Sequence, residues 1–142
     1  MNFNINLIKN AMNIHHQSNY DSNIVNEFCD LFYNIMTTKG FVGVEHLFYK
    51  NAYCNYNNNN DIKITDIITL LYSDGINKFK YDNLTHSSTI IDNDTILIQT
   101  YGSCEAILYN FQSTNINLFV ETFVLKNMND KYLIINYLFK II

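Results

Sequence analysis

Two apolar strands joined by a short turn are encoded in residues 119–140, which read FVETFVLKNMNDKYLIINYLFK. Successive residues of a strand point to opposite faces, so the strand expected over residues 118–127 has two apolar faces. One face carries Phe119, Phe123 and Leu125, and the other carries Leu118, Val120 and Val124. After a turn at residues 128–130, residues 131–142 form the last strand. One face can pack on helices, while a large exposed apolar face usually marks an interface, so we expect dimerisation through the sheet.

The helices are expected before this hairpin. Residues 22–37 carry apolar side chains at positions 24, 25, 28, 31, 32, 35 and 36, which form one wide stripe with a period of 3.6. Asp21 or Ser22 can cap its start, and Gly40 follows as a stop. A second helix is expected over residues 41–49, and a third over residues 66–73 with Thr65 as its cap. The wide stripe must lie against another apolar layer, which favours packing on a sheet.

From residue 78 the apolar period changes from 3.6 to 2. Strands are expected over 78–82, 84–91 and 95–105, with a hairpin turn at 92–94, and over 52–56 upstream, with a polar turn at 57–61. Helices that precede a long antiparallel meander predict an α+β fold: three helices packed on a strongly curved antiparallel sheet. We expect one domain over 22–142, with residues 1–21 as an extension that is either helical or disordered.

The composition excludes several classes of function. The chain has 142 residues, a net charge of −4 and only 15% charged residues, and all nine of its basic residues are scattered lysines. A nucleic-acid partner is not expected, because phosphate binding needs clustered cations. No apolar run approaches the 18 residues of a membrane span. Cys29, Cys54 and Cys104 are far apart and odd in number, which favours free thiols in a reducing, intracellular compartment, the cytoplasm or nucleus.

Residues 119–140 resemble the closing hairpin of the nuclear transport factor 2 (NTF2) family, whose pattern is roughly F-x-Q-x-F-[LV]-L-x(n)-[YW]-x-[IV]-x-N-D-x-F-[KR]. Residues 28–33, FCDLFY, look like the family's F-[VI]-x-x-Y-Y helix, and residues 47–52, LFYKNA, look like its L-x-x-[FY]-Y-x-[DN]-[AS] junction. The resemblance covers about residues 22–142. It implies an NTF2-like cone, a dimer packed through the sheet, and partners such as Phe-Gly (FG) repeat peptides or a like-folded domain.

The departures from this pattern bear on the partners. The family's Gln is Glu121 here, and its Asn-Asp pair is Asn136-Tyr137. Nuclear transport factor 2 binds Ran through carboxylates around a cavity, but the corresponding loops at 56–60 and 110–117 contain none, so we do not expect Ran binding. Tyr20 falls near the family's peptide-binding Trp, so we expect it to bind the peptide.

We therefore predict a non-catalytic protein-binding module in nucleocytoplasmic transport or mRNA-export complexes, without metal or cofactor. The alternatives are a cone-pocket isomerase or dehydratase, with His86 and Asp92 as weak catalytic candidates, and a scaffold that has lost Ran binding. The expected dimer interface is formed by Phe123, Leu125, Asn136, Leu138 and Phe139. The expected pocket lining is formed by Phe28, Phe32, Tyr56 and Phe119.

Overall fold

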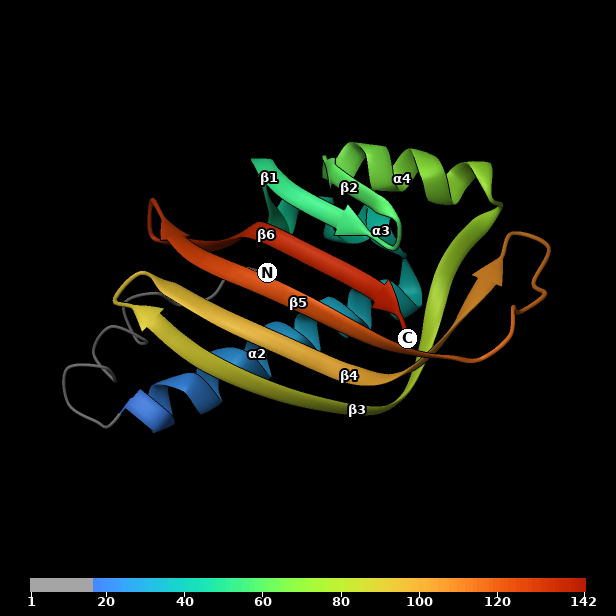
Figure 1. Cartoon of the computed structure of the whole chain (residues 1–142). Helices are drawn as coiled ribbons and strands as arrows, with labels where there is room; N and C mark the ends of the chain where they lie inside the picture. Colours follow the sequence, from blue (N-terminus) through green and yellow to red (C-terminus); the bar gives the residue numbers. More distant parts are fainter. Residues whose placement is uncertain (1–16) are drawn as a thin grey trace.

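The computed structural model describes the backbone of residues 17–142 and the side chains from Asn23 onward. Its helices are α2 (Gln17–Thr38), α3 (Phe41–Val44), the 3-10 helix η1 (Glu45–Leu47) and α4 (Ile64–Ser73). Its strands are β1 (Phe48–Tyr56), β2 (Asn59–Ile62), β3 (Ile76–Asp92), β4 (Thr95–Leu108), β5 (Asn117–Met128) and β6 (Lys131–Ile141). Figure 1 shows a curved sheet with α2 running behind it and α4 lying near its β1–β2 end.

The six strands form one mixed sheet in the order β2-β1-β6-β5-β4-β3. All neighbours are antiparallel except β1 and β6, which run parallel with Tyr53 opposite Asn136. The expected sheet was wholly antiparallel, and this pairing corrects it. The parallel pair arises because the chain leaves β1 for α4 and the far edge of the sheet, and then returns through the meander β3–β6 to lie beside β1.

The helix boundaries differ from the expected ones at identifiable points. α2 begins at Gln17, so it includes part of the predicted extension 1–21, while residues 1–16 lie outside the described residues. The second helical segment ends at Leu47 because Phe48 is already extended and begins β1. α4 begins at Ile64 rather than Asp66, since the Lys63 backbone N–H donates to the Asp66 carboxylate at 2.9 Å. Thr65 therefore lies inside the helix and is not its cap.

The predicted strands merge and lengthen in the structure. β3 continues through both segments predicted over 78–91, and the irregular register between Asp82 and Thr85 coincides with a left-handed Asn83 (φ 56°). Asparagine tolerates this conformation better than most residues. The expected polar turn at 57–61 is shorter, because the chain turns at Asn57 (φ 53°) and residues from Asn59 already pair with β1.

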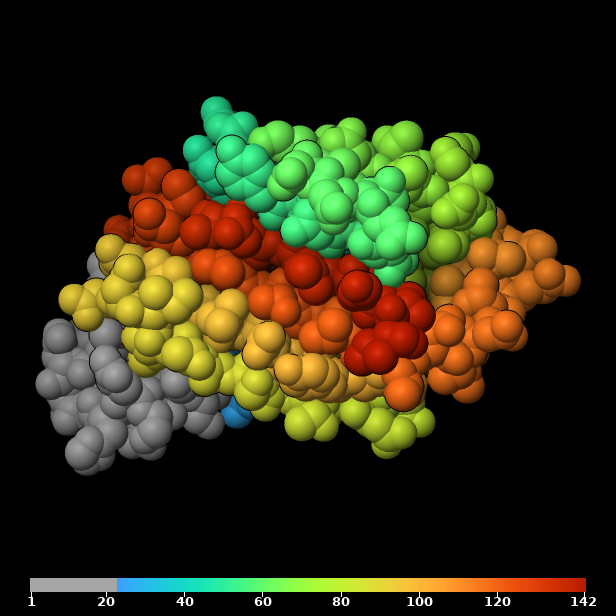
Figure 2. Space-filling view, in the orientation of Figure 1, coloured from blue at the N-terminus to red at the C-terminus, as the bar shows by residue number. Residues whose placement is uncertain are grey.

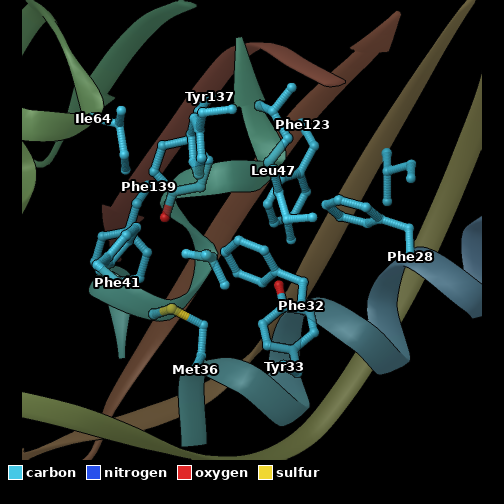
Figure 3. Close-up of a cluster of buried hydrophobic side chains, with 14 of the residues drawn as sticks. Phe28, Phe32, Tyr33, Met36, Phe41, Leu47, Ile64, Phe123, Tyr137 and Phe139 are labelled. Carbon is cyan, nitrogen blue, oxygen red and sulfur yellow. The ribbon is translucent and has the colours of Figure 1, made fainter. Parts of the chain in front are cut away.

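The core lies between α2 and the inner, helix-facing side of the sheet. On β5, alternate side chains from Phe119 to Leu125 are buried. Phe123 packs edge-on against both Phe28 and Phe32 of α2, with 4.8 Å between ring centroids in each pair. Figure 3 shows these rings meeting between the helix and the strands. Each such side chain contributes roughly 1.5–3 kcal/mol by burial, so this contact fixes the helix on the sheet.

Candidate functional site

A buried polar cluster interrupts this aromatic core. Glu121 points inward from the middle of β5 and is only 1% exposed. The Tyr33 hydroxyl of α2 donates to Glu121 Oε1 at 2.6 Å, and the Tyr137 hydroxyl of β6 donates to Oε2. Both carboxyl oxygens therefore have partners, which a buried polar group requires. The Glu121 side chain therefore links α2, β5 and β6 through two hydrogen bonds.

The surroundings keep Glu121 partly protonated near neutral pH. Burial raises the pKa of Glu121 from 4.5 to about 7, while the hydrogen bonds from Tyr137 and Tyr33 act in the opposite direction. Burial and the charge of Glu121 together raise the pKa values of Tyr33 and Tyr137 well above 10. The phenols thus remain protonated donors, and Glu121 is the group in the cluster that can exchange a proton near neutral pH.

His86 forms a second arm of the cluster. It is half-buried on the inner side of β3, its Nδ1 lies 2.9 Å from Oγ1 of the fully buried Thr100, and its ring stacks on Tyr33 with 5.9 Å between centroids. Burial lowers the pKa of His86, and the charge of Asp30 opposes that shift. The arrangement places a neutral imidazole beside the tyrosine that contacts Glu121. Such a set of groups can donate and accept protons.

The two catalytic candidates from the sequence have different positions. His86 belongs to the cluster just described. Asp92 is exposed at the C-terminal end of β3. Its carboxylate accepts a hydrogen bond from the backbone N–H of Asp94 at 2.8 Å and stabilises the hairpin turn. Asp92 therefore does not orient His86. The carboxyl group that belongs to the buried cluster is Glu121, which sequence analysis singled out only as a replacement of Gln.

The residues predicted to line a pocket are core residues in this structure. Phe28, Phe32, Tyr56 and Phe119 are all buried. The Phe28 and Phe32 rings stack at 5.7 Å, and Tyr56 and Phe119 stack on Phe139 at 4.9 and 5.6 Å. These contacts make all four rings part of the core, and Figure 3 shows Phe28, Phe32 and Phe139 within it.

The outer face of the sheet carries a second apolar surface, here called the outer patch. It consists of Leu97 and Tyr101 of β4, Leu118, Val120 and Val124 of β5, Leu133 and Leu138 of β6, and Tyr53 of β1. Leu118 and Tyr53 are each 64% exposed and Tyr101 is 44% exposed, while the others are partly buried by their neighbours. Figure 2 shows this face, with β4, β5 and β6 crossing its centre.

The predicted dimer residues divide between the two faces. Asn136 and Leu138 lie on the outer face. Phe123, Leu125 and Phe139 are at most 4% exposed beneath the helices of the same chain, so their assignment to an interface was wrong. The alternation had grouped Phe123 and Leu125 correctly, but the interface was assigned to the face that the helices cover. The side chain of Tyr20 lies outside the described residues.

Other site types have little support in the described part of the chain. Among the residues described, no group of three or more His, Cys, Asp or Glu side chains could hold a metal ion. The three cysteines are free and buried, as predicted. Within residues 17–142, none of the helices is both long and apolar enough to span a bilayer.

Comparisons with known proteins identify the fold. No protein-family model matches the chain, and no curated protein matches it. Among solved structures, nuclear transport factor 2 from Cryptosporidium parvum is 14% identical with a TM-score of 0.66, over 82% of this chain and 90% of that one. The association domain of C. elegans CaMKII is 16% identical with a TM-score of 0.64, over 87% of this chain and 96% of that one.

An enzyme also has this architecture. Hexachlorocyclohexane dehydrochlorinase LinA-type3 from Novosphingobium barchaimii is 10% identical with a TM-score of 0.61, over 77% of each chain. Identities this low show a shared fold and leave the activity open, because one fold hosts many functions. The chain therefore has the NTF2-like fold, as its closing hairpin had suggested.

Proposed function

We propose that the chain is a non-catalytic association module that pairs with a second copy of itself through the outer patch. The observation that carries this proposal is the second apolar face of β4–β6, which remains exposed after α2 has covered the first. Contiguous apolar surface on a soluble domain usually marks an interaction site. The outer patch also has few charges at its centre, as interface cores do.

The structural neighbours support the same conclusion. One neighbour is named as an association domain, and this chain matches nearly the whole of it. The packed aromatic contacts at Phe28, Phe32 and Phe123 favour a binding role over one that needs a large interior cavity.

The test is a charge at the centre of the outer patch. Leu138 is opposite Thr122 on β5, between the outward side chains of β1 and β5. Leu138→Glu would bury an unpaired carboxylate in this interface, so we expect the variant to lose association through the outer patch. Val42→Glu is the matched control, because Val42 is an exposed apolar residue of α3 and does not belong to the outer patch. The readout is mass from light scattering after gel filtration. A wild-type chain that is monomeric at 50–100 µM, or an assembly whose mass Leu138→Glu does not reduce, contradicts the proposal.

The transport role and its partners form the finer part of this proposal. The resemblance of the sequence motifs supports two further parts of the proposal: Tyr20 binds FG-type peptides, and the protein acts in the cytoplasm or nucleus. A labelled Phe-Gly peptide should bind the wild-type chain and bind Tyr20→Ala more weakly. If both proteins fail to bind it, the peptide-binding part is wrong and the association module remains.

A second candidate function follows from Glu121. A carboxyl group that is partly protonated near pH 7, two phenol donors and a neutral imidazole can together move a proton at a carbon next to a carbonyl group. Deuterium uptake from D2O into a small ketone, followed by NMR, tests this candidate. Exchange should fall in Glu121→Gln and persist in Asp92→Asn, whose exposed side chain only holds a turn. Exchange no faster than in buffer removes this candidate.

A further inference from the structure

The free edge of the sheet at β3 is a second surface, separate from the outer patch. Among the described residues, β4 is the only strand that pairs with β3, and β3 ends the sheet opposite β2. Residues 83–91, Asn-Leu-Thr-His-Ser-Ser-Thr-Ile-Ile, therefore present one row of backbone N–H and C=O groups away from β4. Figure 1 shows this half of β3 along the rim of the sheet, with α2 behind it.

This edge has few of the features that usually prevent strands from pairing. Natural edge strands are protected by lysine, proline, bulges or short length. Residues 83–91 contain no charged residue and no proline, whereas Lys78, Lys80 and Asp82 all fall in the other half of β3. The bulge at Asn83 marks the boundary between the charged and uncharged halves. The uncharged half is therefore a regular segment that can accept another strand.

We propose that two copies of the chain join at this edge, with residues 83–91 of each copy paired antiparallel about a twofold axis at Ser87. In that register Thr85 lies opposite Thr89, His86 opposite Ser88, and Leu84 opposite Ile90. The partly buried positions 84, 86, 88 and 90 then meet partly buried positions, and the exposed Thr85, Ser87 and Thr89 meet exposed ones. The cross-strand pair of Thr85 and Thr89 is favourable.

The sequence selects this register over its neighbours. A shift by one residue would place the inner side chains of one copy opposite the outer side chains of the other. A shift by two keeps the faces matched, but it extends one end of the pairing into the bulge at Asn83 or the turn at 92–94. The register centred on Ser87 is the one that uses the whole uncharged segment.

A cysteine at the proposed axis tests the register directly. Opposed residues of an antiparallel pair have Cα atoms about 4.5–5.5 Å apart, which suits a disulfide. Ser87→Cys should therefore form a cross-linked dimer on mild oxidation. Ile91→Cys is the matched control: it is 56% exposed on the same strand, but its copies would lie roughly 27 Å apart. The native cysteines are buried and should not interfere. Equal cross-linking of both variants, or of neither, overturns the proposal.

A charge at the same position separates this edge from the outer patch. Ser87→Lys places two like charges directly opposite one another, so we expect edge pairing to weaken by at least about tenfold. The Leu138→Glu variant should still pair through its edges, and Leu138→Glu with Ser87→Lys should be monomeric by light scattering. If Leu138→Glu alone is already monomeric, the edge proposal fails and the outer-patch proposal stands. If Ser87→Lys alone is monomeric, the outer-patch proposal fails and the edge proposal stands.

Discussion

The two faces of β5 differ in the size and chemistry of their side chains more than in their apolar character. The inner face carries Phe119, Glu121 and Phe123, all of which are buried. The outer face carries Val120, Thr122 and Val124, which are only partly covered. Large rings fill the deep space under a helix, while short β-branched side chains give a flat surface suited to a strand and to a partner. Hydrophobicity alone therefore does not tell which face of such a strand is the core.

The largest effect should come from emptying the inner face. Phe123→Ala removes a ring that contacts Phe28, Phe32 and Tyr137 at centroid distances of 4.8–5.5 Å. We expect the free energy of unfolding to fall by about 3–5 kcal/mol, because truncating a buried Phe also leaves a cavity. Urea unfolding measures the loss, with Phe111→Ala as the control, since the Phe111 side chain is exposed. Comparable losses in the two variants would show that the inner face is not the main core.

The buried acid of the inner face should make stability depend on pH. Glu121 titrates at about pH 7 in the folded chain and at 4.5 when exposed. Between these values the unfolded chain releases a proton that the folded chain keeps. The free energy of unfolding should therefore decrease by about 3 kcal/mol as the pH rises from 4.5 to 7, and this contribution should then stay constant.

Glu121→Gln isolates this contribution, because an amide cannot titrate. We expect the variant to become more stable relative to wild type as the pH rises from 5 to 7.5. The difference between their urea midpoints measures this change. His86 has a lowered pKa and gives the opposite slope below about 6.5, but it is present in both proteins and cancels in the comparison. A pH-independent difference would mean that Glu121 is ionised throughout.

Periodicity was sufficient to predict the layers of the fold. The two-residue alternation of β5 buries the side chains that the pattern groups together, and the 3.6-residue stripe of α2 buries all of its side chains except Leu31 and Ile35, which are partly buried. The parallel β1–β6 pairing could not be predicted in this way, because alternation does not report which strand lies next to which. The interface was misassigned for a related reason: both faces of residues 118–127 are apolar, and local sequence does not show which one α2 covers.

The polar cluster was missed because its members are far apart in sequence. Tyr33 and Glu121 are 88 residues apart, and only the fold brings the phenol to the carboxyl group. One signal was available in the alternation itself. Glu121 lies two residues from both Phe119 and Phe123, so alternation places its acidic side chain on the same face as theirs, in the apolar layer. A charged residue in phase with core residues predicts a partner across the core.

The smallest effect should come from the outer face of the same strand. Val124→Thr exchanges one β-branched side chain for another of similar shape at a partly exposed position opposite Asn136. In the background that combines Leu138→Glu with Ser87→Lys, which we expect to be monomeric, the free energy of unfolding should change by no more than about 0.5 kcal/mol, as at most surface sites. In the otherwise wild-type chain, the added hydroxyl should weaken association at the outer patch, because it would lose its hydrogen bonds to water there without gaining a partner. Sedimentation equilibrium measures that association constant. A large loss of stability in the monomer would mean that the outer patch belongs to the core of a single chain, and the distinction between the two faces would then disappear.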